Sequence, residues 1–499
     1  MAMYEPIRGH DEAEEEKKKR GVECCSGDVH VDGVVDDVEM AIHSRSSTSA
    51  TSKIEDEGSK QRRLHQHQPP PKPQSQRLVS LDVFRGLTVA LMILVDNAGG
   101  VLPAINHSPW NGVTLADFVM PFFLFIVGVS LALTYKKLSC STVATRKAIV
   151  RTLKLLLLGL FFQGGFLHGI NNLTYGVDIE QIRWLGILQR IAIAYLLTAL
   201  CEIWLKGVDN VNSGSSLLRK YRFQWFFALM LTTLYLFLLY GLYVPDWEYQ
   251  IPIKSSSSAP KMFSVKCGVR GDTGPACNAV GMIDRKILGI NHLYRRPVYA
   301  RTEQCSINSP DYGPLPSDAP SWCQAPFDPE GLLSSVMAIV TCLVGLHYGH
   351  IIVHFKVIHI HGIARLPFVT EVFSFFSPIF IHSHIQDHKD RIFHWMITTS
   401  CLILLGLSLD LCGMHLNKVL YSFSYMCFTA GVAGILFAAI YLMVDVCGYR
   451  RLTLVMEWMG MHALMIYIIA ACNIVPVVLQ GFYWGRPQNN ILRLIGIGS

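Results

Sequence analysis

The chain has 499 residues, of which 51% are hydrophobic and only 16% are charged, and its mean hydropathy is +0.33. A soluble domain carries about 25% charged residues, so this composition argues against a soluble protein. The apolar residues gather in runs of about 20, the length that a helix needs to cross a bilayer. The net charge is +6, and the basic residues cluster in short loops. Outside these loops no basic patch is interleaved with aromatic residues, so we expect no nucleic-acid binding.

Residues 1–79 differ sharply in composition from the rest of the chain. They are rich in Glu, Lys, Ser, Gln and Pro, with a charged run at residues 14–20 and a proline-rich run at residues 69–73. Such a segment cannot bury enough apolar surface to order itself, so we predict a disordered tail. It has no apolar run typical of a cleaved signal peptide, and the first span, starting near Leu81, would act as the signal anchor.

Next along the chain, two apolar runs within residues 81–136 flank a short turn that contains His107. Asp96 and Asp117 lie near the turn-side ends of these runs. Ionisable residues inside apolar spans are costly unless they are paired or line a wet cavity, so both are candidates for a functional site. A histidine at the mouth of such a cavity is suited to moving a proton or an acyl group. The alternative, an interfacial histidine beside a Trp110 membrane anchor, has equal weight on these residues alone.

Residues 80–499 are predicted to form one transmembrane domain. The pattern indicates an all-α, polytopic bundle of about 9–10 membrane-spanning helices. A tenth span, at residues 474–497, is less well supported because prolines and arginines interrupt it. Nine spans are expected at residues 82–101, 114–135, 149–167, 184–205, 224–244, 332–354, 393–412, 419–444 and 453–472.

Basic residues concentrate in alternate loops, which sets the expected orientation. Arg146, Lys147 and Arg151 belong to the most basic stretch, between the second and third spans. The positive-inside rule places this stretch and the N-terminus in the cytosol. His107 then lies on the opposite, lumenal or extracellular, side.

Two further charged groups lie within the predicted spans. Arg190 lies about two turns inside the fourth span and needs an acidic partner or an anionic ligand, and Asp96 and Asp117 are the candidate partners. Asp82 and Arg85 share one helical face and are interpreted as a structural pair. These residues indicate a membrane protein with a polar intramembrane cavity, and they do not separate an enzyme from a transporter.

Residues 245–330 form a large polar loop on the non-cytosolic side, too long to be a linker. Its four cysteines favour two disulfides in an oxidising compartment, with three pairings open and four free thiols as the alternative. These cysteines are Cys267, Cys277, Cys305 and Cys323.

Residues 357–386 form an apolar insert in an otherwise short basic loop. Such an insert is unusual in a cytosolic loop, and we hypothesise that it is a retained intron read in frame. Pro367 and Pro378 disfavour a re-entrant or interfacial helix. The insert has two His-x-His pairs without an accompanying carboxylate and cysteine set, so no metal site is predicted.

Six stretches, among them LDVFRG and NHSPWNGVTLADF, together resemble the heparan-α-glucosaminide N-acetyltransferase family of lysosomal membrane enzymes. The resemblance covers most of residues 80–485 in order. The matching stretches are residues 81–86, 106–128, 182–195, 281–294, 327–335 and 417–431.

The resemblance implies that an acetyl group passes from cytosolic acetyl-CoA to the amino group of a terminal, glucosamine-like sugar on the lumenal side. The membrane would be lysosomal, vacuolar or another endomembrane. His107 matches the family's active-site histidine, acting either through an acetyl-histidine or as a general base for direct transfer. Asp96 and Asp117, the acidic residues near the turn-side ends of the two apolar runs, are the other candidate catalytic residues. The basic candidates for binding the CoA phosphates are Arg85, Arg146, Lys147, Arg151 and Arg190.

The expected partners are membrane lipid and a glycan acceptor, and a homo-oligomer is left open. Asp96 lies near the position at which the family has an asparagine. This difference and the 357–386 insert leave two alternatives open, another acceptor sugar or an inactive homologue. The rival class is a transporter that uses the same polar cavity. A transporter would tend to show inverted repeats, and no clear internal repeat is visible in the sequence.

Overall fold

The computed structural model describes residues 78–99, 105–136, 140–168, 174–177, 182–207, 211, 213–251, 261–355 and 377–471. The predicted tail, residues 1–79, lies outside the described residues except for its last two positions. The tenth predicted span and residues 357–376 of the insert also lie outside them.

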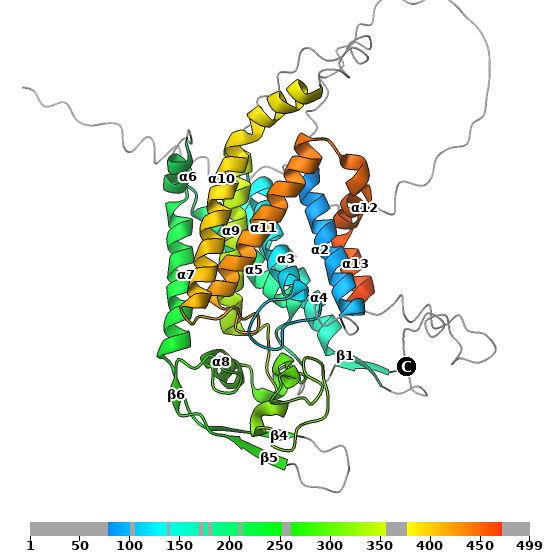
Figure 1. Cartoon of the computed structure of the whole chain (residues 1–499), viewed down its shortest axis with the longest axis vertical. Helices are drawn as coiled ribbons and strands as arrows, with labels where there is room; N and C mark the ends of the chain where they lie inside the picture. The colour runs from blue at the N-terminus through cyan, green and yellow to red at the C-terminus, as the bar shows by residue number, and fades with distance from the viewer. Residues whose placement is uncertain are drawn as a thin grey trace, which may run out of the picture. The chain divides into compact units, whose positions relative to one another are not determined.

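Within the described residues, each of the nine spans expected from the sequence coincides with a helix or a bent pair of helices (Figure 1). The all-α polytopic fold is therefore confirmed. These helices are α2 (Val79–Ala98), α3 (Val119–Thr134), α4 (Ser141–Gly164), α5 (Ile187–Trp204), α7 (Arg222–Gly241), α9 (Leu332–His354), α10 (Ser377–Leu411), α11 (Phe423–Tyr441) and the pair α12 (Arg450–Met461) and α13 (Ala463–Ala471).

Length and composition give fewer spans than the sequence pattern predicts. Of the described helices, six are long and apolar enough to cross a membrane, and up to seven if α12 and α13, bent by 69°, form one span. Helices α2 and α4 have the length but carry more charge: α2 contains Asp82, Arg85 and Asp96, and α4 has four basic residues. Whether these two helices cross the membrane stays a prediction.

Helices α3 and α9 make the most extensive contact between two helices of the bundle. Glycines on both helices let the two backbones approach closely. A Cβ atom on Gly128 would lie 2.0 Å from the carbonyl oxygen of Cys342, and one on Gly345 would lie 2.1 Å from that of Phe125. Helix α9 is buried along almost its whole length. Small residues at these positions therefore determine how tightly the central helices pack.

The large loop predicted at residues 245–330 folds into a compact region at one end of the bundle (Figure 1). Two short antiparallel pairs, β3 with β6 and β4 with β5, lie beside α8, and the structure pairs Cys267 with Cys277 and Cys305 with Cys323. Its elements are β3 (Tyr243–Val244), β4 (Trp247–Ile251), β5 (Lys261–Val265), β6 (Val269–Arg270), α8 (Ala279–Ile287), η2 (Ile290–His292), η3 (Val298–Arg301) and η4 (Ser321–Gln324).

Three smaller elements complete the described fold. The strands β1 (Gly165–His168) and β2 (Thr174–Val177) form an antiparallel hairpin after α4, and α6 (Gly214–Lys220) precedes α7. Helix α10 begins at Ser377, so residues 377–386 of the insert are helical, contrary to the expectation from Pro378. The reason is position: this proline lies in the first turn, where its missing N–H breaks no helical hydrogen bond.

Candidate active site

His107 lies in the turn between α2 and the short helix η1 (Leu115–Phe118) and faces a buried carboxylate. Its Nδ1 is 2.8 Å from Oδ1 of Asp117, whose side chain is fully buried, whereas the side chain of His107 is 34% exposed. The other carboxylate oxygen of Asp117 accepts hydrogen bonds from the backbone N–H groups of Ser108 and Thr114, at 3.1 and 3.0 Å. These bonds fix the carboxylate before any ligand arrives.

A lysine that the sequence analysis did not single out completes this cluster. Lys418 comes from the loop of residues 412–422, between α10 and α11, and its Nζ lies 2.8 Å from Nδ1 and 3.3 Å from Nε2 of His107. The same Nζ is 3.6 Å from Oδ1 of Asp117. The signal in the sequence was a charged residue directly before the apolar run of α11, inside one of the family-like stretches.

Charge and burial set the protonation of the histidine. Burial and the Lys418 ammonium lower the pKa of His107, and the hydrogen bond to Asp117 acts in the opposite direction. A carboxylate facing Nδ1 favours a proton on that nitrogen, which leaves the lone pair on Nε2. The ring is therefore arranged as a neutral base or nucleophile.

The folded loop region holds the backbone of His107 in place. Arg301, the last residue of η3, donates through Nη1 to the side-chain oxygen of Asn106 at 2.7 Å and through Nη2 to the carbonyl oxygen of His107. The same oxygen of Asn106 accepts from the N–H of His107 at 2.8 Å. Because η3 lies four residues before Cys305, a disulfide-linked segment positions the histidine.

Trp110 packs inside the protein. It is 8% exposed, makes edge-on contacts with the rings of Tyr299 and Phe327, and donates through Nε1 to the carbonyl oxygen of Thr273 at 3.1 Å. The alternative of an interfacial tryptophan anchor therefore does not describe this turn. Instead, Trp110 fastens the turn that carries His107 to the loop region.

The other predicted catalytic residue, Asp96, is not part of the cluster. It is exposed near the end of α2, and within the described residues no hydrogen bond or ion pair involves it.

Arg190 lies on the first turn of α5, at the same end of the bundle as His107. Its Nη2 donates to the carbonyl oxygen of Pro329 at 2.6 Å and to the hydroxyl of Ser334, and its guanidinium lies over the ring of Tyr421. These contacts replace the predicted pairing with Asp96 or Asp117, because the segment before α9 folds over the start of α5 and supplies a carbonyl oxygen.

The remaining four basic candidates lie in the first halves of α2 and α4, away from the end of the bundle that carries His107. Arg85 pairs with Asp82 at 3.0 Å and contacts Ser130 at 3.2 Å, as expected for a structural pair. Arg146, Lys147 and Arg151 are exposed on the first half of α4. The five residues predicted to bind CoA therefore do not form one site: four lie at one end of the bundle, and Arg190 lies at the His107 end.

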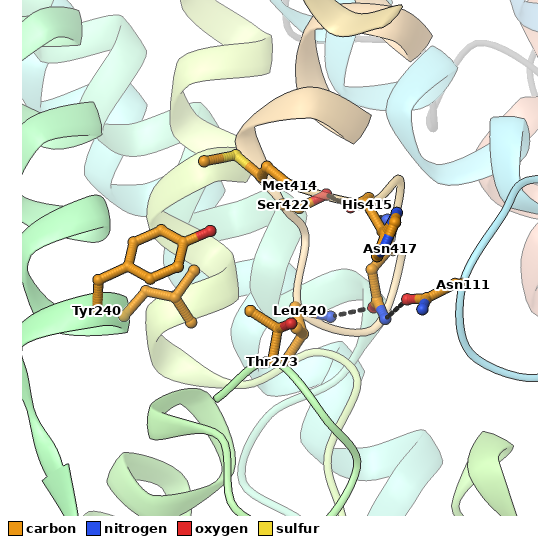
Figure 2. A pocket seen from close by; sticks show the side chains of 9 residues that line it. Asn111, Tyr240, Thr273, Met414, His415, Asn417, Leu420 and Ser422 are labelled. Carbon is orange, nitrogen blue, oxygen red and sulfur yellow. Dashed lines mark hydrogen bonds between the residues drawn. The ribbon is translucent and has the colours of Figure 1, made fainter. Parts of the chain in front are cut away.

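A small pocket adjoins the loop of residues 412–422 (Figure 2). The side-chain Nδ2 of Asn417 donates to Oδ1 of Asn111 at 3.3 Å, and the side-chain oxygen of Asn417 accepts from the backbone N–H of Leu420 at 2.8 Å (Figure 2). Together with Thr273 and Tyr240, these side chains give the pocket a mixed polar and apolar lining.

The part of the chain that the structure describes contains no cluster of three or more His, Cys, Asp or Glu side chains suited to a metal ion.

The fold and the cluster define a multi-pass membrane protein with a histidine–aspartate pair at one end of its helix bundle. Residues 77–241 match the profile of the family described as "Heparan-alpha-glucosaminide N-acetyltransferase, catalytic". This confirms the resemblance inferred from the sequence: the chain is related to these acetyltransferases. The matched residues include His107 and Asp117, whereas Arg301 and Lys418 lie beyond them.

Two curated relatives carry the name "Heparan-alpha-glucosaminide N-acetyltransferase". The Mus musculus protein is 31% identical over 298 residues, which is 56% of this chain and 40% of the mouse protein. The Homo sapiens protein is 27% identical over 414 residues, which is 79% of this chain and 52% of the human protein. The chain thus spans about half the length of the curated relatives it matches.

Proposed function

We propose that this protein is a membrane-bound N-acetyltransferase that uses acetyl-CoA to acetylate the amino group of a glucosamine-like sugar at the end of a glycan. The observation that carries the proposal is the placement of His107. Its Nδ1 faces the buried carboxylate of Asp117 at 2.8 Å, and the ring is partly open to the outside. The name shared by the two relatives supports the acceptor class.

In direct transfer, Nε2 of His107 accepts a proton from the acceptor amine while the amine nitrogen attacks the thioester carbonyl carbon. The new C–N bond forms, the C–S bond breaks, and the proton passes from His107 to the departing CoA sulfur. The products are an N-acetyl sugar and free CoA thiol. In the covalent alternative, Nε2 itself attacks the carbonyl carbon, the C–S bond breaks and CoA leaves as the thiolate. The amine nitrogen then attacks the acetyl carbon, the bond from that carbon to Nε2 breaks, and the proton lost by the amine passes to the CoA thiolate.

The two ends of the bundle serve the two substrates. The exposed basic residues Arg146, Lys147 and Arg151 lie at the end away from His107 and suit the phosphates of cytosolic CoA. The His107 end carries the disulfide-linked loop region, as expected for a lumenal face in an oxidising compartment. We place the protein in a lysosomal, vacuolar or other endomembrane, with its N-terminus in the cytosol.

Incubating the purified full chain with labelled acetyl-CoA and a panel of amino and hydroxyl sugars tests the proposal. We expect label to pass to glucosamine-type amines and His107→Ala to lose transfer while still inserting into membranes. Label transfer that is unchanged in His107→Ala would remove this residue from the reaction. Uptake of a sugar without acetylation would favour a transporter instead.

A further inference from the structure

Lys418 places a cation directly against the imidazole ring of the candidate base. Its Nζ lies within hydrogen-bonding distance of both ring nitrogens of His107, at 2.8 and 3.3 Å. The lysine side chain is only 19% exposed, so water screens its charge poorly. A cation this close to an imidazole penalises the protonated ring.

The geometry at Nδ1 assigns different roles to the two partners of the ring. An imidazole nitrogen makes one hydrogen bond in the ring plane, so Nδ1 cannot serve Asp117 and Lys418 together. A carboxylate only accepts, and it therefore takes the N–H of Nδ1. The ammonium only donates, so with the Nδ1 proton facing Asp117 the lone pair left for it is the one on Nε2, at 3.3 Å. Its shorter distance of 2.8 Å to Nδ1 is then a close approach of the cation to the ring and not a second hydrogen bond.

Other charged groups around the pair adjust this arrangement without reversing it. Arg301 adds a second positive charge that disfavours the protonated ring, and Asp117 favours it. Burial lowers the pKa of Lys418 and the charge of Arg190 acts in the same direction, whereas the negative charges of Asp117 and Glu330 raise it. The carboxylates on η1 and on the segment before α9 therefore favour the charged form of the lysine, against the effect of its burial.

We propose that Lys418 is a positioning residue for His107: its ammonium holds the imidazole uncharged, with the proton on Nδ1 facing Asp117 and the lone pair on Nε2. The inference deepens the proposed function, on which its catalytic meaning rests. An imidazole that is already protonated cannot take the proton of an acceptor amine. The lysine therefore keeps the base usable at a mildly acidic pH, where a free histidine is mostly charged. The acceptor displaces the ammonium from Nε2 when it binds.

The first test reads the charge of His107 without using activity. Diethyl pyrocarbonate modifies uncharged imidazoles, and peptide mass spectrometry gives the rate at His107 in the purified full chain from about pH 4 to about pH 8. Lys418→Met removes the cation, so we expect the midpoint of this profile to rise by about 1 pH unit. Lys418→Arg keeps the charge and should keep the midpoint near that of the natural chain. Lys286→Met, which removes an exposed lysine on α8, is the matched control and should change nothing.

An unchanged or lower midpoint in a folded Lys418→Met protein overturns the inference. If that variant fails to fold, Lys418→Gln carries the same expectation with a polar side chain. In acetyl transfer, the acid limb of the pH profile should move upward by the same amount in the uncharged variants, whereas a purely structural role would lower the rate and leave the limb in place. Absence of acetyl transfer in the natural chain would refute the proposed function and leave the reactivity test intact.

Discussion

At the scale of single residues, Asp117 is expected to determine which nitrogen of His107 carries the proton. Replacing it with asparagine keeps the size of the side chain and removes the charge, so the ring loses its fixed tautomer. We expect Asp117→Asn to lower kcat by about 100-fold or more, with a smaller effect on KM. Steady-state kinetics with a glucosamine acceptor measures both constants. A kcat equal to that of the natural chain would show that the carboxylate is only structural.

Acid pH should reduce both activity and stability through His107. The folded protein lowers the pKa of this histidine below its ordinary value of 6.5. The unfolded chain therefore binds the proton more readily, and stability falls as the pH drops below 6.5 toward the lower pKa of the folded state. Activity is expected to fall in the same pH window, which lies below the pH at which a free histidine becomes protonated. A pH series of acetyl transfer and thermal unfolding checks this, with His107→Ala expected to lose this contribution to the pH dependence of stability.

The sequence named His107 and Asp117 as candidate catalytic residues because both lie at one turn, ten positions apart, but it offered Asp117 as a partner of Arg190 and did not predict its contact with His107. It did not reveal Lys418 or Arg301, which are 311 and 194 positions from His107 and reach it only through the fold. Asp96 was included because an acid within an apolar run suggests a cavity. The structure leaves it exposed, since proximity along α2 does not determine which way a side chain faces.

At the scale of elements, the disulfide between Cys305 and Cys323 connects the loop region to the site. It closes a segment of 18 residues just after η3, whose Arg301 donates to the carbonyl oxygen of His107. Changing both cysteines to serine should destabilise this region by about 3 kcal/mol, because the unfolded loop regains its freedom. We also expect acetyl transfer to fall, since Arg301 loses its support.

Differential scanning fluorimetry and the transfer assay measure these two effects. Cys401→Ser, which removes an exposed free cysteine of α10, is the matched control. A double variant with the stability and activity of the natural chain would show that this disulfide does not support the site.

The glycine contact between α3 and α9 gives a second prediction for the elements. In Gly128→Ala the new methyl group would meet the backbone oxygen of Cys342, so the helices must move apart. We expect a loss of about 1–3 kcal/mol, seen as a lower unfolding temperature in detergent. Gly241→Ala, where the nearest atom would be 3.8 Å away, should be tolerated. Equal unfolding temperatures for the two variants would count against a tight contact.

The elements themselves were largely predictable, because runs of about 20 apolar residues leave few alternatives to a helix. The pattern was less informative where other forces act. The start of α10 was obscured by Pro378. In the polar segment at 245–330 the sequence indicated two disulfides and family-like stretches, but not that the segment folds around a small core that includes Tyr249 and Val265.

At the scale of the whole molecule, the orientation in the membrane can be tested with two natural cysteines. Cys412 is exposed just after α10, at the His107 end, and Cys447 is exposed beyond α11, at the opposite end. A membrane-impermeant maleimide applied to sealed vesicles should modify Cys412 only from the lumenal face and Cys447 only from the cytosolic face, as peptide mass spectrometry would show. The reverse pattern would invert the proposed orientation.

Acetyl transfer across a sealed membrane tests the central claim most directly. The full chain is reconstituted in vesicles, and the fraction with its cytosolic face outward receives labelled acetyl-CoA outside and a glucosamine acceptor enclosed inside. The account predicts that labelled N-acetyl sugar accumulates inside, and that His107→Ala abolishes it while the vesicles stay sealed. Product that forms only when donor and acceptor share one side of the membrane would contradict the account.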